Sequence, residues 1–395
     1  MTLLAPMLPF SNFHVSIAMA MLGLLTVAGV RVTMSLYALS LHMSAFQIGS
    51  LIAMFGLFPM LFAVRAGRWL DRVGSATPLL AGSMLIFSGA LTATLQRQSW
   101  LLYPAAACAG TGFTLVLMAA QNLVGQLGPD ESRTNRLTTM TLLMSVATIA
   151  APVLAGLIID HFSHRSAFTL FAATALVLLL LVLWLAKHLP TLITPASQSD
   201  APRSALALFW HAPRLRLVYI VNILLAAAWD LFMFSTPIQG SAKHFSASTI
   251  GLILGSFSFA TFVIRFAMPM LSRHFGHWQI ILAALGVTAC GFLLYPFLQQ
   301  AGGVMLLAFV LGLALGASQP NLLSLLFESA PEGRMGEVLG IRLTIGNGAQ
   351  ALLPMLFGAV GAKLGWVPVF VLLSALLAGG VALVWKDGIH AAPHA

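Results

Sequence analysis

Charged residues are scarce in this chain of 395 residues: only 7% are Asp, Glu, Lys or Arg, whereas 59% are hydrophobic. A soluble domain of this size needs many more charged side chains to solvate its surface, so the composition excludes one. The chain also has only two cysteines, Cys108 and Cys290, both in apolar stretches. Two such thiols form no disulfide framework and behave as small hydrophobes.

Patterns that carry catalysis or hold a cofactor are missing as well. The eleven histidines do not cluster, and neither a zinc-ligand spacing nor a Ser/His/Asp arrangement can be assembled. No P-loop or dinucleotide-binding glycine pattern occurs, which argues against an ATP-driven pump. We therefore expect a protein that is not an enzyme and that uses no cofactor and no metal.

Most of the chain consists of twelve apolar segments of membrane-spanning length. A helix needs about 20 apolar residues to cross a bilayer, and backbone groups in lipid must be satisfied within the segment. The runs are continuous rather than alternating, which predicts helices and excludes a β-barrel. The expected spans are 14–40, 45–66, 77–96, 100–126, 137–159, 166–186, 214–238, 247–270, 278–299, 302–327, 338–360 and 365–385.

The net charge of +9 is unevenly spread over the connections between these spans. If both termini lie on one side, thirteen basic residues fall on that side and four on the other. This bias predicts an inner (cytoplasmic) membrane protein with both termini in the cytoplasm, rather than a nucleic-acid-binding protein. The thirteen are Arg65, Arg68, Arg72, Arg133, Arg136, Lys187, Arg203, Arg214, Arg216, Arg265, Arg273, Arg334 and Lys386, and the four are Arg97, Arg165, Lys243 and Lys363.

The two halves of the chain repeat each other at a constant offset of 202 residues. A proline-rich polar stretch at 188–213 separates them and has the composition of a linker. We therefore expect a six-helix bundle at 1–187, a cytoplasmic linker at 188–213 and a second six-helix bundle at 214–395. Matching pairs are Ser44-Ala45-Phe46-Gln47-Ile48-Gly49 with Ser246-Ala247-Ser248-Thr249-Ile250-Gly251, Gly74 with Gly276, Gly110 with Gly312, Pro129 with Pro331, Pro152 with Pro354, Gly156 with Gly358 and Phe168 with Phe370.

A short charged stretch, Gly67-Arg68-Trp69-Leu70-Asp71-Arg72-Val73-Gly74, reads as a tight turn between the second and third spans. It resembles the G-x-x-x-D-R-x-G loop of the major facilitator superfamily, and the duplicated halves extend this resemblance over the chain. The resemblance implies an all-α membrane fold of twelve helices in two pseudo-symmetric six-helix bundles, working by alternating access. It also implies a conformational latch at Gly67, Asp71, Arg72 and Gly74, with Asp71 facing the cytoplasmic end of the eleventh helix.

Two charged residues, Arg31 and Asp230, lie well inside spans. Subtracting the repeat offset from Asp230 gives Ala28, within one helical turn of Arg31, so the two charges can meet between the halves. We interpret Arg31 as a site for a substrate anion and Asp230 as the acceptor of a proton or cation. The alternative is a structural ion pair that orients the helices.

Several uncharged polar residues are candidates for the same substrate and proton pathway: Asn222, Tyr219, Asn347 and Gln350. Tyr219 shares a helix face with Asp230, whereas hydrogen bonding between helices would explain Asn347 and Gln350 equally well. Arg265 and Arg342 lie nearer the cytoplasmic ends of their spans, where we expect them to anchor the helix or reach outward to the membrane face.

We expect a monomeric secondary transporter whose partners are the bilayer, a small-molecule substrate and a proton or other coupling ion. The first interpretation is proton-coupled efflux of an amphipathic or anionic compound. The segment 150–156, Ala-Ala-Pro-Val-Leu-Ala-Gly, resembles the Gly-Pro-x-x-Gly-Gly motif of superfamily antiporters and favours export. The alternative is uptake of an organic anion with Arg31 as counter-ion. A third possibility is a non-transporting receptor or sensor, although the chain lacks a soluble signalling domain.

Overall fold

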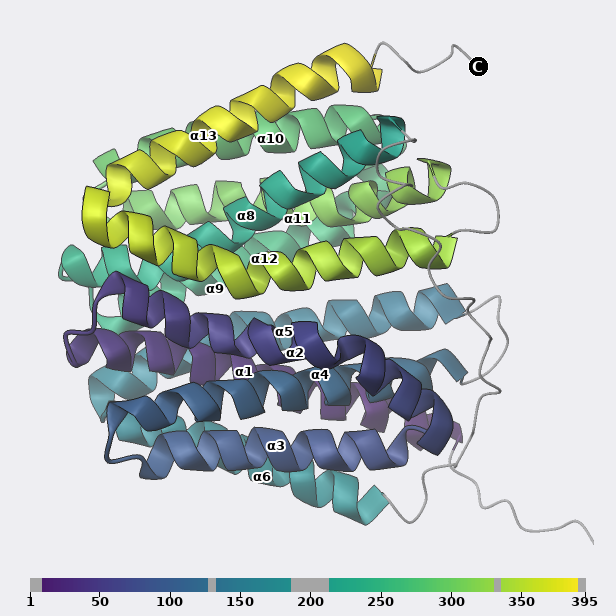
Figure 1. Cartoon of the computed structure of the whole chain (residues 1–395), viewed down its shortest axis with the longest axis vertical. Coiled ribbons are helices and arrows are strands. Elements are labelled where there is room, and N and C mark those ends of the chain that lie inside the picture. Colours follow the sequence, from purple (N-terminus) through teal and green to yellow (C-terminus); the bar gives the residue numbers. More distant parts are fainter. Residues whose placement is uncertain (1–8, 127–132, 186–212, 330–334, 390–395) are drawn as a thin grey trace, which may run out of the picture.

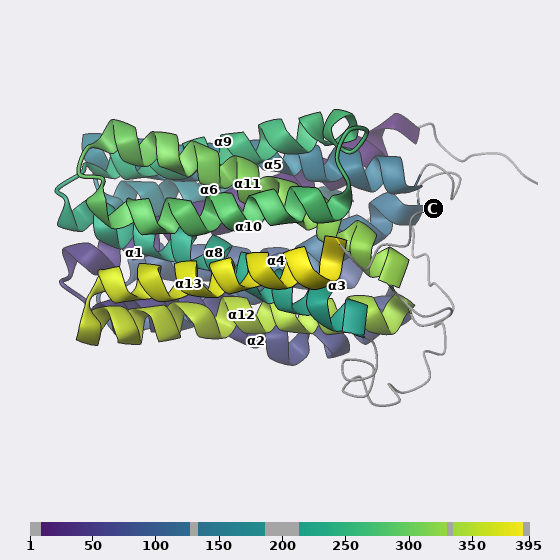
Figure 2. The same ribbon diagram turned by 90° about the horizontal axis from the view of Figure 1, so that it is seen from above.

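The computed structural model consists of long helices that run roughly parallel to one another (Figures 1 and 2). It describes residues 9–126, 133–185, 213–329 and 335–389, and no strand occurs among them. Twelve of the helices are long and apolar enough to cross a membrane, which confirms the twelve predicted spans. They are α1 (Pro9–Ser40), α2 (Ala45–Val73), α3 (Ala76–Leu95), α4 (Leu102–Gln126), α5 (Arg133–His161), α6 (His164–Leu185), α8 (Pro213–Ala242), α9 (Ala247–Leu271), α10 (His277–Leu294), α11 (Ala301–Ser329), α12 (Met335–Leu364) and α13 (Trp366–Leu383).

Three short helical segments complete the described chain: η1 (Ser99–Leu101) before α4, η3 (Tyr295–Phe297) after α10 and a π-helical turn, η4 (Val384–Ile389), after α13. The predicted linker lies outside the described residues except for Pro213, which begins α8. The short connections after α1, α3, α5, α8, α10 and α12 all lie at the same end of the helices, which we call the turn face.

The helices α1–α6 pack around one apolar core and α8–α13 around another, and Figure 1 shows the two sets side by side. Two helices, α1 and α8, contribute a buried residue to the core of the other half. Leu36 of α1 is buried in the core of the second half, and Ile238 of α8 is buried in the core of the first. These residues are equivalent in the repeat, so α1 and α8 occupy the same place in the two halves.

The repeated Ser-Ala sequence forms the same cap at the start of α2 and α9. The Ser44 hydroxyl accepts a hydrogen bond from the backbone N–H of Gln47 at 3.3 Å, and the Ser246 hydroxyl accepts one from Thr249 at 3.2 Å. Such caps satisfy N–H groups that a helix start leaves unpaired. Two residues before each cap the chain takes a positive φ, 56° at His42 and 59° at His244. The duplication is therefore visible at the level of single dihedral angles.

The halves meet along two seams, α2 against α12 and α5 against α9. Backbone touches backbone there, because four glycines leave no side chain between the helices. A Cβ atom on any of them would lie impossibly close to a carbonyl oxygen of the other half. The distances are 2.2 Å from Gly49 to Pro354, 2.4 Å from Gly358 to Ala45, 2.3 Å from Gly251 to Pro152 and 2.2 Å from Gly156 to Ala247.

These contacts are two copies of one contact, since each pair in the first seam maps onto a pair in the second at the repeat offset. The seams lie toward the turn face, where α2 and α9 begin. Toward the opposite end α2 diverges from α12 (Figure 1), and a Cβ on Gly346 of α12 would meet nothing within 4 Å. The halves are thus closed against each other at the turn face and separate toward the opposite end.

The predicted eight-residue turn after the second span is wrong in its length. Helix α2 continues to Val73, so that only Gly74 and Ser75 separate it from α3. Gly74 ends the helix with a φ of 77° and donates its N–H to the carbonyl of Leu70 at 2.9 Å. The charged residues from 68 to 72 mark the membrane boundary, but they are compatible with a helix and do not end it. The side chain of Asp71 lies outside what the structure describes, so the latch stays a prediction.

Large apolar side chains cover the outside of the molecule, particularly on α6 and α13. Leu180 and Trp184 on α6 are 56% and 66% exposed, and Leu372 on α13 is 59% exposed. Apolar surface of this extent requires an apolar surrounding. These helices therefore face lipid.

Candidate functional site

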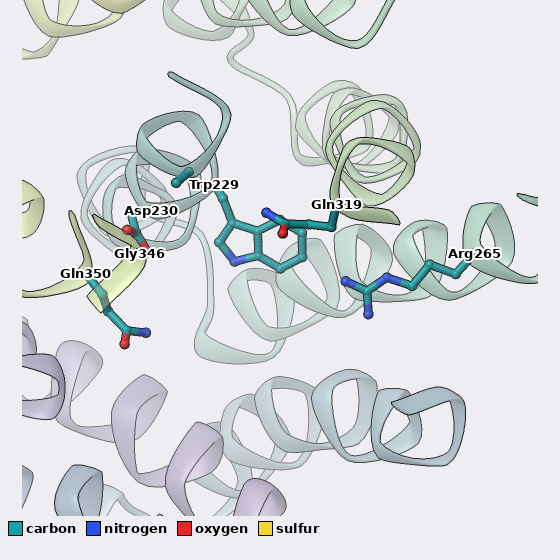
Figure 3. Close-up of a pocket in the computed structure, with 7 residues that line it drawn as sticks. Trp229, Asp230, Arg265, Gln319, Gly346 and Gln350 are labelled. Atoms are coloured by element: carbon teal, nitrogen blue, oxygen red, sulfur yellow. The ribbon is translucent and has the colours of Figure 1, made fainter. Parts of the chain in front are cut away.

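A cavity of about 310 Å³ opens among α8, α9, α11 and α12, near the lower limit of the usual volume for small-molecule sites (Figure 3). Helices of the first half, in purple and blue, lie across from it in the same view. The cavity lies beyond the seams, on the side where the halves separate. Its lining residues are Ala226, Trp229, Asp230, Arg265, Gln319, Gly346 and Gln350.

Asp230 is the acid in this lining, and its side chain is only 7% exposed. It lies on α8, opposite Arg31 on α1, and the two charges attract each other between the halves. They are not in direct contact, because within the described ranges the one direct ion pair joins His277 and Glu328 at 3.5 Å. The Nη2 atom of Arg31 is buried and has no hydrogen-bond partner among the described residues. The predicted pair is thus present, but its two charged groups are not in direct contact.

Trp229 occupies the centre of the cavity in Figure 3. Its indole meets the ring of Phe257 edge to face, with centroids 4.8 Å apart and an interplanar angle of 80°. Phe257 in turn stacks on Phe232 at 4.6 Å and 18°. Both phenylalanines are fully buried. The indole is therefore backed by a rigid aromatic group and presents its remaining surface to the cavity.

Two arginines that we expected at the membrane face turn inward instead. Arg265 lines the cavity, because α9 runs on to Leu271 and leaves this residue more than one turn inside the helix end. Arg342 on α12 donates from Nη2 to the Oε1 atom of Gln319 on α11 at 2.7 Å. Its Nε atom is buried and unpartnered among the described residues. The expectation of outward anchoring is wrong for both.

Of the predicted pathway residues, the structure brings Asp230 and Gln350 into the cavity and Arg31 close to Asp230. Tyr219, Asn222 and Asn347 are not part of the lining. The fully buried Tyr219 donates its hydroxyl to the carbonyl oxygen of Val338 at 3.0 Å, which ties α8 to the start of α12. Five lining residues are missing from the predicted site: Ala226, Trp229, Arg265, Gln319 and Gly346.

A cavity in one of two repeated six-helix halves, on the side that faces the other half, is compatible with the arrangement of a secondary transporter. The Major Facilitator Superfamily model matches residues 15–354 and, in a second match, residues 219–393. The chain therefore belongs to the major facilitator superfamily, and it is a multi-pass membrane transporter rather than an enzyme.

Among its relatives, the uncharacterized MFS-type transporter YuxJ of Bacillus subtilis is 24% identical over 292 residues, which are 70% of each chain. The class G tetracycline resistance protein of Vibrio anguillarum is 25% identical over 342 residues, 81% of this chain and 83% of that protein.

Solved structures share the fold at lower identity. A POT family transporter in complex with 5-aminolevulinic acid superposes with a TM-score of 0.81 at 13% identity, covering 95% of this chain and 96% of the other. A mutant of the nucleoside transporter NupG superposes with a TM-score of 0.76 at 14% identity, covering 95% and 99%. At these identities the likeness concerns the fold alone.

Proposed function

We propose that this transporter carries a small anionic solute into the cell together with protons, with Asp230 as the proton site. The observation that carries this proposal is a buried carboxylate in the cavity that faces Arg31 of the other half without touching it. An ionisable group inside a membrane is costly unless it is paired or functional. A separated pair leaves each partner able to bind something else.

The separated pair supplies a means of coupling. When Asp230 takes up a proton, Arg31 loses its counter-charge and gains affinity for an anionic group of a solute. A solute bound at Arg31 in turn favours the protonated acid, because coupling between two sites is reciprocal. Release of the solute allows the proton to leave, so the solute and the proton bind together and move in the same direction.

The packing supports alternating access to this site. The halves are closed at the turn face by the glycine seams, whereas the cavity lies on the side where they separate. Rocking one half against the other would separate the seams at the turn face and close the cavity at the opposite end. With both termini in the cytoplasm, as the basic residues predict, the described conformation opens toward the cytoplasm.

The names of some relatives point to the opposite direction. Several of them are named tetracycline resistance proteins, among them class E of Escherichia coli and class H of Pasteurella multocida. Resistance to a compound fits its removal from the cell, which is the first interpretation of the sequence. Efflux in exchange for protons requires that solute and proton exclude each other at the site, so it differs from uptake in the sign of the proton movement and is separable by experiment.

The test uses everted membrane vesicles in which respiration acidifies the lumen and a fluorescent dye reports the pH gradient. A panel of organic anions, neutral amphipathic compounds and tetracycline is either loaded into the lumen or added from outside. A co-transported anion loaded into the lumen should leave with protons and dissipate the gradient, whereas a solute that dissipates it when added from outside would indicate exchange. Asp230→Asn should abolish this response, whereas Glu328→Gln, which neutralises an exposed acid away from the cavity, should retain it. An unchanged response in Asp230→Asn would exclude Asp230 as the coupling site.

A further inference from the structure

The cavity carries more positive than negative charge. Asp230 is the acid among the lining residues, and its charge is already balanced by Arg31. Arg265 is the cation in the lining, so the cavity together with Arg31 has two positive charges and one negative charge. Within the described ranges no carboxylate and no other hydrogen-bond acceptor is placed against its guanidinium. A cavity of this balance attracts an anion and repels a cation.

The uncharged polar groups around Arg265 also present donors. Arg342 has no acceptor atoms, so its bond to Gln319 fixes that amide with the oxygen toward Arg342 and the NH₂ group turned away from it. The indole N–H of Trp229 adds another donor, because the described residues offer it no acceptor. An anionic group beside Arg265 would thus meet further donors from α8 and α11.

We propose that the transported solute is an aromatic anion, with its ring held against Trp229 and its acidic group bound by Arg265. This inference rests on the proposed function and specifies the substrate of the same site. The backing of Trp229 by Phe257 gives a fixed apolar surface for a ring. A guanidinium binds a carboxylate, phosphate or sulfonate through two parallel N–H groups. The cavity volume of about 310 Å³ suits a solute of one or two rings.

The test measures binding to the purified full-length protein in detergent, without any proton gradient. The probes are 2-naphthoate, the neutral 2-naphthalenemethanol, the cationic 2-naphthylmethylamine and the non-aromatic cyclohexanecarboxylate. We expect 2-naphthoate to raise the apparent melting temperature most, because a ligand of the native state stabilises it. Tighter binding of the amine than of 2-naphthoate would overturn the proposal.

Two substitutions separate the roles of charge and ring. Arg265→Gln should weaken 2-naphthoate binding at least tenfold and leave 2-naphthalenemethanol unaffected, whereas Trp229→Leu should weaken both aromatic probes. Arg265→Lys keeps the charge and should retain part of the affinity for 2-naphthoate. Binding by this variant would also demonstrate that a substitution at this position permits folding. Arg273→Gln removes an exposed arginine outside the cavity and serves as the control. If Arg265→Gln weakened the binding of 2-naphthoate and of 2-naphthalenemethanol equally, Arg265 would not bind the acidic group.

The outcomes distinguish this inference from the proposed function. Asp230→Asn should bind 2-naphthoate at least as tightly as the unaltered protein, since it removes a like charge, while losing the proton response in vesicles. If another solute dissipates the gradient but 2-naphthoate neither binds nor is transported, the substrate class is wrong and the proton-coupled transport stands.

A second, independent observation concerns the α5–α9 seam. The carboxylate of Asp160, near the end of α5, accepts hydrogen bonds from the first N–H groups of α9, at 3.0 Å from Ala247 and 2.7 Å from Ser248. It also accepts one from the Ser248 hydroxyl. An anion at a helix N-terminus is stabilised by the unpaired N–H groups and by the helix dipole. The bond joins the two halves at the turn face.

The other seam lacks this bond. The repeat equivalent of Asp160 is Ala362, which carries no acceptor, although the backbone contacts beside it are the same. We infer that Asp160 is a second latch, distinct from the one predicted at Asp71, and that it holds the turn face closed through the α5–α9 seam. Opening the turn face separates the carboxylate from α9 and exposes both to water, so the latch favours the closed state.

The latch is tested by pulsed EPR distances between spin labels at Ser99 and Gln299, which lie on exposed turn-face connections of the two halves, in a protein without Cys108 and Cys290. Asp160→Ala should raise the ratio of open to closed states about two- to thirtyfold, the range expected for an anion at a helix start. Ala362→Asp should do the opposite, because it supplies the missing carboxylate to the N-terminus of α2. The same distance distribution in all three proteins would refute the latch.

Discussion

One of the glycine contacts between the halves predicts the effect of adding a single methyl group. In Gly251→Ala the new Cβ would lie 2.3 Å from the carbonyl oxygen of Pro152, whereas ordinary contact begins at 3.4 Å. The helices α5 and α9 must therefore separate by the difference, about 1.1 Å, wherever the seam is closed. In the open state the same methyl group has no such neighbour.

The magnitude follows from this difference between states. Forcing extra atoms into a packed contact costs about 1–3 kcal/mol. Alanine is also a better helix former than glycine by about 1 kcal/mol, but this gain is present in both states and cancels from their ratio. The open-to-closed ratio at the turn face should thus rise by about 5- to 150-fold, the factors that correspond to 1–3 kcal/mol.

The labelled pair used for the latch, Ser99 with Gln299, also measures this shift. The matched control is Gly286→Ala in the interior of α10, where a Cβ would meet nothing within 4 Å. The control should keep the distance distribution of the parent and gain the helix-forming benefit. The reasoning is refuted if Gly251→Ala and Gly286→Ala give the same distribution.

Three further predictions test the topology and the roles of single residues. Tyr219→Phe should lower the free energy of unfolding by about 0.5–1.5 kcal/mol, because it removes a buried hydrogen bond. Substrate affinity should not change, and a loss of transport without a loss of stability would indicate that Tyr219 is part of the substrate pathway. An impermeant thiol reagent added to sealed cells should label a cysteine at the exposed Ser99 and not one at the exposed Thr77; the reverse pattern would invert the orientation. The exchanged pair Arg31→Asp with Asp230→Arg should fold and yet fail to couple protons; recovery of transport with its pH dependence would indicate a purely structural pair.

Most of the fold is predictable because the bilayer imposes it. Each span must satisfy its own backbone and present apolar side chains, so length and hydropathy identify all twelve helices. The repeat offset adds tertiary information, since Gly49 with Pro354 and Gly251 with Pro152 make the same contact twice. The end of α2 was mispredicted for the opposite reason, because polarity marks where lipid ends and a helix can continue into water.

The cavity was only partly predictable. Asp230 and Gln350 are polar residues in spans, and that signal was sufficient. Arg265 was assigned to anchoring because a basic residue near the end of a span satisfies the positive-inside rule without any further role. Trp229 carries no polar signal, since a tryptophan in an apolar run has the composition of a core residue. Its role depends on the edge contact with Phe257, which only the folded packing reveals.

The repetition of the seams makes the contact between the halves self-complementary. Each half contributes one helix start and one helix end, as two subunits do in an isologous dimer. Two copies of the first half would therefore present matching surfaces to each other. Correct pairing within one molecule depends on the covalent connection, which keeps the right partner at a high effective concentration. The expected misassembly at high expression is thus a domain-swapped dimer, in which each first half closes on the second half of another chain.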